Sequence, residues 1–220
     1  MKGKVQGFAL FDFDGTLSPG DSIVPYLQLC IQSGVAPARQ WIHAFLGYCA
    51  QRVNPKRTAL SKEQTLSFIR GKSMELMDTV SEKFWNEYLM PRMYRDGLKV
   101  LQEMHDAGYI IWLISASPEC YMHLATRFLP VDRVYATPCQ HSEDGFYTGS
   151  IPYNCRGEEK VAVFREAVRN CGLEQVPVQF AFGDSQHDIP MLRLAEHAVL
   201  IRPKPRVRQM LPEAEVQNWQ

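Results

Sequence analysis

The sequence lacks several features that would mark a particular class of protein. It has no excess charge of either sign, because 24 Lys and Arg balance 24 Asp and Glu. Its one short basic stretch, Arg202–Arg208, is typical of a solvated terminus, so we expect no nucleic acid partner. None of the six cysteines lies in a CxxC pair, which argues against a zinc knuckle or a redox motif and favours reduced thiols.

Long apolar runs are also missing. No segment reaches the roughly 20 apolar residues that a membrane span needs. The apolar stretch near the N-terminus is too short for the core of a signal peptide and is interrupted by Asp12. We therefore expect a cytoplasmic protein without a membrane span.

What the sequence does contain is an alternation of apolar strands with helical segments. Strands are predicted near residues 7–13, 110–114, 133–137, 178–182 and 198–201. This alternation predicts an α/β fold, a Rossmann-like three-layer core in which helices cover both faces of a parallel sheet. A chain of 220 residues can bury one such core and a smaller appended domain.

The segment from Leu17 to about Pro91 breaks this alternation. It has no strand candidate, and helices are predicted near residues 22–33, 37–52, 61–70 and 78–90. We interpret residues 17–91 as a helical domain inserted after the first strand, which leaves residues 1–16 and 92–220 for the core. A β-hairpin is predicted over Cys139–Ile151, with Glu143-Asp144-Gly145 at its centre.

Two aspartates follow the first predicted strand. In the run Phe11-Asp12-Phe13-Asp14-Gly15-Thr16, the strand delivers acid groups to the carboxyl edge of the sheet, where open α/β sheets bind ligands. Alternate side chains of a strand share a face, so we expect Asp12 and Asp14 in one pocket. A metal ion, a lysine or a shared proton must then relieve their repulsion. The alternative is a solvated strand end followed by an Asp-Gly turn.

A second pair of acids follows the strand near residues 178–182. Asp184 lies at the strand end and Asp188 about one turn further on, where a helix is predicted over Ile189–His197. Carboxylates without paired His or Cys favour Mg²⁺ over zinc. Alternatively, Asp188 only caps that helix.

Two further segments have the chemistry of a phosphate site. The strand at residues 110–114 ends in Ser115-Ala116-Ser117-Pro118, and a helix is predicted over Glu119–Phe128. A hydroxyl and free N–H groups at a helix start can hold an anion. Lys160 lies near the start of another predicted helix, where a cation opposes the helix dipole unless it pairs with carboxylates or phosphate. The alternatives are an ordinary helix cap and a solvated surface lysine.

The order of these four motifs resembles that of the haloacid dehalogenase superfamily of phosphohydrolases. The resemblance covers Gly7 to about Pro205 and is closest to the phosphoserine phosphatase-like branch, subfamily IB. It implies a Mg²⁺-dependent phosphomonoester hydrolase that acts through an aspartyl-phosphate. It also implies that the helical insertion is a C1-type cap over the active site.

The resemblance gives each motif residue a role. It implies that Asp12 is the nucleophile and that Asp14 is the general acid and base, with Ser115 and Lys160 completing the catalytic set. The residues expected to bind the phosphoryl group are Gly15, Thr16, Ala116 and Ser117. The residues expected to hold Mg²⁺ are Asp12, Asp14 through its main-chain carbonyl, Asp184 and Asp188.

The resemblance also bears on the substrate, which we expect to be a small-molecule phosphomonoester. Asp21 stands where the phosphoserine phosphatases carry a Glu that recognises the substrate amine, and Arg70 aligns loosely with their carboxylate-binding Arg. Phosphoserine is therefore one candidate. A phosphatase of lipid headgroups or proteins, a phosphotransferase or mutase, and a non-catalytic phosphoryl-sensing module stay open, as does the oligomeric state.

Overall fold

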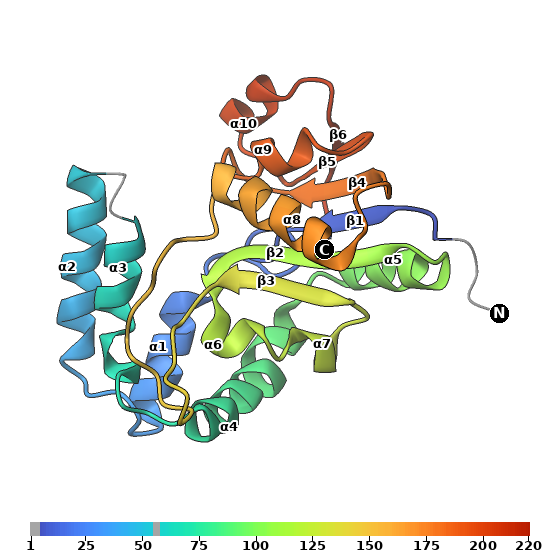
Figure 1. The fold of residues 1–220 in the computed structure, drawn as a ribbon. Coiled ribbons are helices and arrows are strands. Elements are labelled where there is room, and N and C mark those ends of the chain that lie inside the picture. The colour runs from blue at the N-terminus through green and yellow to red at the C-terminus, as the bar shows by residue number, and fades with distance from the viewer. Residues whose placement is uncertain (1–4, 55–57) are drawn as a thin grey trace.

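A six-stranded parallel sheet forms the centre of the molecule (Figure 1). The structure is a computed structural model that describes residues 5–54 and 58–220. The order of the strands in the sheet is β3-β2-β1-β4-β5-β6. In chain order, the strands are β1 (Phe8–Phe11), β2 (Ile110–Pro118), β3 (Arg133–Thr137), β4 (Val178–Gly183), β5 (His197–Ile201) and β6 (Glu215–Gln217).

Helices pack on both faces of this sheet, which confirms the predicted three-layer α/β fold. The helices within the predicted insertion are α1 (Ile23–Gln32), α2 (Gln40–Val53), α3 (Thr58–Thr65) and α4 (Met74–Phe84), and α5 (Arg95–Asp106) follows it. The later helices are α6 (Glu119–Met122), α7 (Ala125–Phe128), α8 (Glu158–Cys171), α9 (Ile189–Leu192) and α10 (Pro205–Met210). Among the described residues, no helix is long and apolar enough to cross a membrane.

The side chains of β1 alternate between two hydrophobic cores, which is why this strand is apolar throughout. Phe8 and Leu10 belong to the core shared with α8, α9 and α10. Ala9 and Phe11 belong to the core on the opposite face, which is shared with α1, α4, α5 and α6. A central parallel strand is buried on both faces, so its sequence shows no polar alternation.

Two predicted helices are shorter in the structure. The helix predicted over 119–128 is divided into α6 and α7. The carbonyls of Cys120 and Tyr121 accept hydrogen bonds from the side chains of Ser81 (2.8 Å) and Trp85 (2.7 Å), in place of the next helical turn. The helix predicted over Ile189–His197 ends at Leu192, because β5 begins only a few residues later.

The edge strand β6 was not predicted, because it has only three residues, two of them polar. The predicted hairpin is present as an antiparallel pairing between His141 and Tyr147. This hairpin also pairs with the segment before α4, since Ser73 forms an antiparallel bridge with Phe146.

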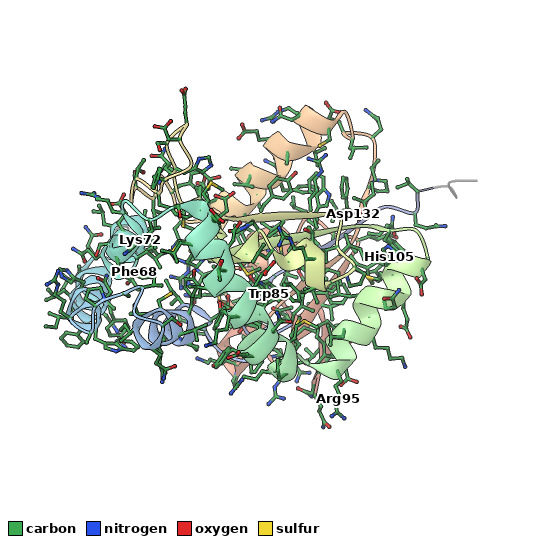
Figure 2. All side chains as sticks on the ribbon, turned by 90° about the horizontal axis from the view of Figure 1, so that it is seen from below. Phe68, Lys72, Trp85, Arg95, His105 and Asp132 are labelled. Carbon is green, nitrogen blue, oxygen red and sulfur yellow. The ribbon has the colours of Figure 1, made fainter. Side chains whose placement is uncertain are left out.

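Within the predicted insertion, α4 lies close to the sheet, whereas α2 and α3 lie further from it (Figures 1 and 2). Figure 2 shows the molecule from below, with Trp85 under the centre of the sheet at the end of α4. Trp85 is fully buried and lies against the rings of Phe13 and Phe128. Figure 1 shows α2 and α3 further out, at the left edge. The domain boundaries, 1–16 with 92–220 and 17–91, stay a prediction, although every strand that the structure describes lies outside the 17–91 segment.

Candidate active site

One pocket lies where β1, β2 and β4 end. Its volume of about 780 Å³ is within the usual range of small-molecule sites. Most residues predicted for the site line it: Asp12, Asp14, Gly15, Asp21, Ser115, Ala116, Ser117, Lys160, Asp184 and Asp188. The sheet thus brings together side chains that are far apart in the sequence, at the edge where ligands were expected.

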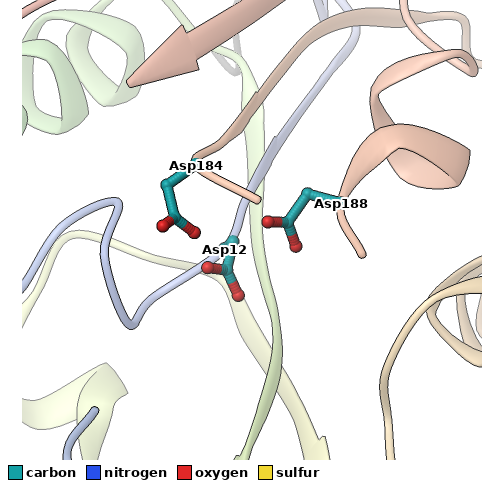
Figure 3. A group of neighbouring side chains, drawn as sticks. All are labelled: Asp12, Asp184 and Asp188. Carbon is teal, nitrogen blue, oxygen red and sulfur yellow. The ribbon is translucent and has the colours of Figure 1, made fainter. Parts of the chain in front are cut away.

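Asp12, Asp184 and Asp188 form a carboxylate cluster within this pocket (Figure 3). One carboxylate oxygen of each residue lies within 4.8 Å of those of the other two. Asp12 and Asp188 are buried, and Asp184 is partly exposed. An all-oxygen donor set of this kind fits a hard divalent cation such as Mg²⁺.

Gly15 leaves the space that Asp184 occupies. Its φ of +84° is a left-handed conformation that favours glycine. A Cβ atom at this position would overlap the Asp184 carboxylate. The glycine after the two acids of the first motif therefore allows the loop to pass directly against the second motif.

Lys160 supplies a cation to the carboxylate cluster from the first turn of α8. Its Nζ donates to Oδ1 of Asp12 and to Oδ1 of Asp188, both at 2.6 Å, and the residue is only 1% exposed. Burial acts to lower the pKa of Lys160, but attraction to Asp12 and Asp188 outweighs it and raises the pKa above its usual value. The lysine is therefore a fixed positive charge in this site.

Asp12 has a raised pKa in spite of this lysine. Burial of the carboxyl group and repulsion from Asp188 raise the pKa of Asp12 to about 6. Its second oxygen, Oδ2, accepts a hydrogen bond from the hydroxyl of Thr16 at 3.3 Å. Asp12 thus lies between one cation and one neutral donor.

The two acids after β4 have different surroundings. Asp188 Oδ2 accepts hydrogen bonds from the main-chain N–H (3.0 Å) and hydroxyl (2.7 Å) of Ser185. Burial opposes ionisation, but Lys160 and these bonds hold the pKa of Asp188 below its usual value. Asp184 accepts no hydrogen bond from another described residue, and burial with repulsion from Asp12 and Asp188 raises its pKa to about 7. Asp184 therefore has free oxygen atoms for a ligand, whereas Asp188 mainly holds Lys160.

Asp14 has one satisfied and one unsatisfied oxygen. Its Oδ2 accepts from the main-chain N–H (3.2 Å) and hydroxyl (2.9 Å) of Ser22 and from the hydroxyl of Ser117. Its Oδ1 is buried and has no hydrogen-bond partner within the described residues. Burial and repulsion from Asp21 raise the pKa of Asp14 to about 7. A carboxyl group in this state can donate a proton near neutral pH.

Ser115 and Ala116 lie beside the pocket, within the last residues of β2. The strand continues to Pro118, beyond its predicted end at Ile114. The Ser115 hydroxyl oxygen accepts from the N–H of Ser117 at 3.0 Å. The α6 helix that follows has only four residues, so the predicted length of this helix is wrong, whereas the anion seat at its start stays a prediction.

Three residues predicted to contact the substrate have other partners. Thr16 is fully buried, does not line the pocket and contacts Asp12. Ser117 does line it, and its hydroxyl donates to Asp14. Arg70 lies outside the pocket because its Nε donates to the carbonyl of Thr148, at 3.0 Å, in the hairpin. The structure therefore does not bring Arg70 to the position expected for a substrate-binding arginine.

Asp21 lies at the start of α1 and beside the pocket. Its Oδ1 accepts from the N–H of Ile23 at 3.0 Å, so it caps the start of α1. It also lines the pocket. Capping alone therefore does not account for its position.

Two cations in the pocket were missed by the sequence analysis. Lys62 on α3 donates from Nζ to the carbonyl of Ala116, and burial lowers the pKa of this lysine. Arg156 lies next to Gly157, and its guanidinium has no hydrogen bond or ion pair to other described residues. The motif around Gly157 could have drawn attention to Arg156. No local pattern marks Lys62, since its contact joins α3 to a distant strand.

Comparisons with known proteins agree with this arrangement. A model of the haloacid dehalogenase-like hydrolase family matches residues 9–193. Phosphoserine phosphatase SerB1 of Mycobacterium tuberculosis is 29% identical over 216 residues, which span 93% of this chain and 68% of that protein. Protein CicA of Caulobacter vibrioides is 26% identical over 194 residues, which span 84% of this chain and 82% of that protein.

Solved structures share the same fold. A protein of unknown function from Bordetella pertussis Tohama I has a TM-score of 0.86 at 22% identity, covering 98% of this chain and 99% of that one. A phosphoserine phosphatase with an analogue of its phospho-aspartyl intermediate has a TM-score of 0.61 at 17% identity, covering 97% of this chain and 93% of that one. At these identities the likeness shows the fold alone.

Proposed function

This chain belongs to the haloacid dehalogenase-like hydrolase family, and we propose that it is a Mg²⁺-dependent phosphomonoester hydrolase. The observation that supports this most directly is that two neighbouring acids have different partners. Asp12 contacts a buried lysine, whereas Asp14 accepts only from neutral donors and keeps one buried oxygen without a partner among the described residues. Environments that separate the roles of two neighbouring carboxyl groups are typical of acid–base and nucleophilic catalysis.

In the proposed reaction, Asp12 is the nucleophile. Its carboxylate oxygen forms a bond to phosphorus while the bond from phosphorus to the alcohol oxygen breaks, which gives an aspartyl-phosphate. Lys160 and Thr16 hold the carboxylate in place through its two oxygens. Ser115, near the end of β2, lines the pocket and would contact the phosphoryl oxygens.

Asp14 transfers the protons in both halves of the reaction. It first donates its proton to the leaving alkoxide oxygen. It then takes a proton from the water molecule whose oxygen attacks phosphorus, and phosphate leaves as the Asp12 carboxylate is restored. Ser22 and Ser117 fix Oδ2, which leaves Oδ1 for the proton transfers.

The carboxylate cluster is suited to the metal ion that this reaction needs. Mg²⁺ would be held by the carboxylates of Asp12 and Asp184 and the main-chain carbonyl of Asp14, with Asp188 in support, and would supply positive charge against the phosphoryl oxygens. Lys160 offsets only one of the negative charges here, so a dianionic phosphate needs further positive charge to enter.

A direct test is a phosphate-release screen over phosphorylated metabolites, lipids and peptides, with and without Mg²⁺. We expect release from at least one small phosphomonoester, and loss of that release when EDTA removes the metal ion. Absence of Mg²⁺-dependent release from all three classes would contradict the proposed function.

Phosphoserine is a candidate substrate, because SerB1 carries the name of that activity. Asp21 lines the pocket and can receive a substrate amine. Arg70 was expected to bind the substrate carboxylate but does not line the pocket, whereas Lys62 and Arg156 do. We propose that these two residues bind a second anionic group of the substrate.

The pKa values of the acids predict how metal and pH act together on stability. Asp12, Asp14 and Asp184 have folded-state pKa values of about 6, 7 and 7, above their ordinary value of 3.8. Between pH 3.8 and a pH of about 7, the folded state binds more protons than the unfolded state. These groups therefore make the metal-free protein less stable as pH rises through this range. We expect Mg²⁺ to raise the melting temperature more at a pH of about 8 than at a pH of about 5.5, because protons compete with Mg²⁺ for the carboxylates at the lower pH.

Thermal unfolding with EDTA or Mg²⁺ at the two pH values measures this effect. The matched variant is Asp184→Asn, which removes one titrating group and should reduce the pH dependence of the Mg²⁺ effect. The same Mg²⁺ effect in the variant and the wild type would show that Asp184 does not contact the metal ion.

Asp14→Asn is expected to lower kcat by about 10²- to 10⁴-fold, because the amide can neither donate nor accept the transferred proton. Mg²⁺ affinity, measured by calorimetric titration, should change little, since only the main-chain carbonyl of this residue is proposed as a ligand. Asp144→Asn makes the same chemical change at an exposed position of the hairpin, so it is the matched control and should retain kcat on p-nitrophenyl phosphate. A large loss of Mg²⁺ affinity in Asp14→Asn would instead place its side chain on the metal ion.

A further inference from the structure

The outward side of α2 carries large apolar side chains that no described element covers. We define the outer face of α2 by its exposed apolar residues: Trp41, Ile42, Phe45, Leu46, Tyr48 and Val53. Phe45 is 65% exposed and Ile42 is 62% exposed. Figures 1 and 2, seen from two directions, both have this helix at the outer edge of the molecule. A contiguous exposed apolar surface of this kind marks an interaction site.

The opposite side of α2 explains why these residues cannot turn inward. Gly47 faces α3 so closely that a Cβ atom there would lie 2.8 Å from the carbonyl oxygen of Ser61. The Gln40 amide donates to the carbonyls of Gln64 (2.8 Å) and Thr65 (2.9 Å). Small and polar residues therefore make the contact with α3, and the large apolar residues lie outside.

The sequence segment that contains this face carries no acidic residue. Between Asp21 and Glu63 the sequence contains no Asp or Glu, while Arg39 and Arg52 are both exposed on or beside α2. The Arg52 guanidinium lies over the Tyr48 ring, 5.2 Å from its centroid. Apolar and aromatic side chains flanked by two exposed arginines complement a partner that is apolar inside and negatively charged at its surface.

A second copy of this chain fits less well. In a two-fold contact the same patch meets itself, so the arginines of one copy, Arg39 and Arg52, would approach the arginines of the other. The segment from residue 22 to residue 62 offers no carboxylate to pair with them. Like charges brought together in this way oppose association.

We propose that the outer face of α2 binds the surface of an anionic phospholipid bilayer. The helix lies in the plane of the membrane, with Ile42, Phe45 and Leu46 in the acyl-chain boundary. Trp41 and Tyr48 lie at the headgroup level, where their rings have both apolar and polar surroundings. The arginines contact lipid phosphates.

This placement brings the membrane next to the pocket. Tyr48 belongs to the outer face of α2 and also lines the pocket, as does Val24 of α1, which is 51% exposed. The bilayer would therefore lie beside the pocket mouth. Docking itself does not depend on the chemistry of the site, so it can be tested without measuring catalysis.

The wild-type protein contains its own reporter for this contact. Of the four tryptophans, Trp85, Trp112 and Trp219 are at most 3% exposed, whereas Trp41 is 40% exposed. Vesicles of phosphatidylcholine with about one third phosphatidylglycerol should shift the tryptophan emission of the protein to shorter wavelength. The protein should also sediment together with these vesicles. Pure phosphatidylcholine should give much weaker binding, and high salt should weaken binding to the anionic vesicles.

Variants test whether α2 makes the contact. The double variant Ile42→Asp/Phe45→Asp should bind anionic vesicles at least about tenfold more weakly. It loses two apolar anchors and gains two negative charges, which the anionic lipids repel. Leu76→Asp changes an exposed leucine of α4 and should bind as the wild type does. Arg39→Gln/Arg52→Gln, which leaves the apolar residues in place, should lose the preference for anionic vesicles.

Three results would overturn the proposal. The first is a wild-type protein that shows neither sedimentation nor an emission shift with anionic vesicles. The second is unchanged vesicle binding in both double variants, each shown to be folded by its thermal unfolding. The third is a wild-type dimer, found by analytical ultracentrifugation, that ignores vesicles and dissociates in Ile42→Asp/Phe45→Asp, which would assign the face to a second copy.

Discussion

Asp12→Asn is expected to lower phosphate release by about 10³-fold or more while the fold is kept. The amide has the size of the carboxylate but cannot form the aspartyl-phosphate. It also removes one negative charge from the cluster with Asp184 and Asp188, so the variant should unfold at the same or a higher temperature than the metal-free wild type. A loss of activity combined with unchanged or increased stability is the pattern of a residue kept for chemistry.

Two measurements separate this role from a structural one. Beryllofluoride with Mg²⁺ should be trapped stoichiometrically by the wild type and not by Asp12→Asn. Asp106→Asn makes the same chemical change at an exposed position of α5 and should retain both activity and trapping. Trapping that persists in Asp12→Asn would assign the nucleophile to another residue.

The sheet could be predicted from the sequence because its strands are buried on both faces. Such strands are short apolar runs, and β1, which is buried throughout, lies inside the range 7–13 that was predicted for it. The acids could be found for a related reason. A carboxylate directly after an apolar strand contrasts sharply with its surroundings, and parallel strands bring their carboxyl ends to one edge.

The parts that were missed depend on contacts between distant residues. The break between α6 and α7 arises because Ser81 and Trp85, on another helix, take carbonyls that the next helical turn would use. The cation Lys62 contacts Ala116 from a helix with no recognisable motif. Arg70 stands near its expected place in the sequence, but pairing with the hairpin holds its side chain elsewhere. Local periodicity contains no information about such partners.

Lys160 combines a local sequence signal with contacts to distant residues. Its place near a helix start could be read from the sequence, but its two partners could not. Lys160→Met should abolish measurable turnover and also destabilise the protein, because it leaves the buried carboxylates of Asp12 and Asp188 without their cation. Removing one partner of a buried ion pair typically costs about 3–5 kcal/mol of unfolding free energy.

The pH dependence of this loss identifies its cause. Without the ammonium group, the pKa values of Asp12 and Asp188 should rise, so at a pH of about 5 protons neutralise them and the variant recovers part of its stability. At a pH of about 8 both must ionise in a buried site, and the loss should be largest. Urea unfolding in EDTA at the two pH values measures the difference, with Lys99→Met as the control, since Lys99 is exposed and its Glu103 contact is 3.7 Å long. A loss of the same size at both pH values would mean that Lys160 stabilises the fold by packing its alkyl chain, and that the carboxylates do not need its charge.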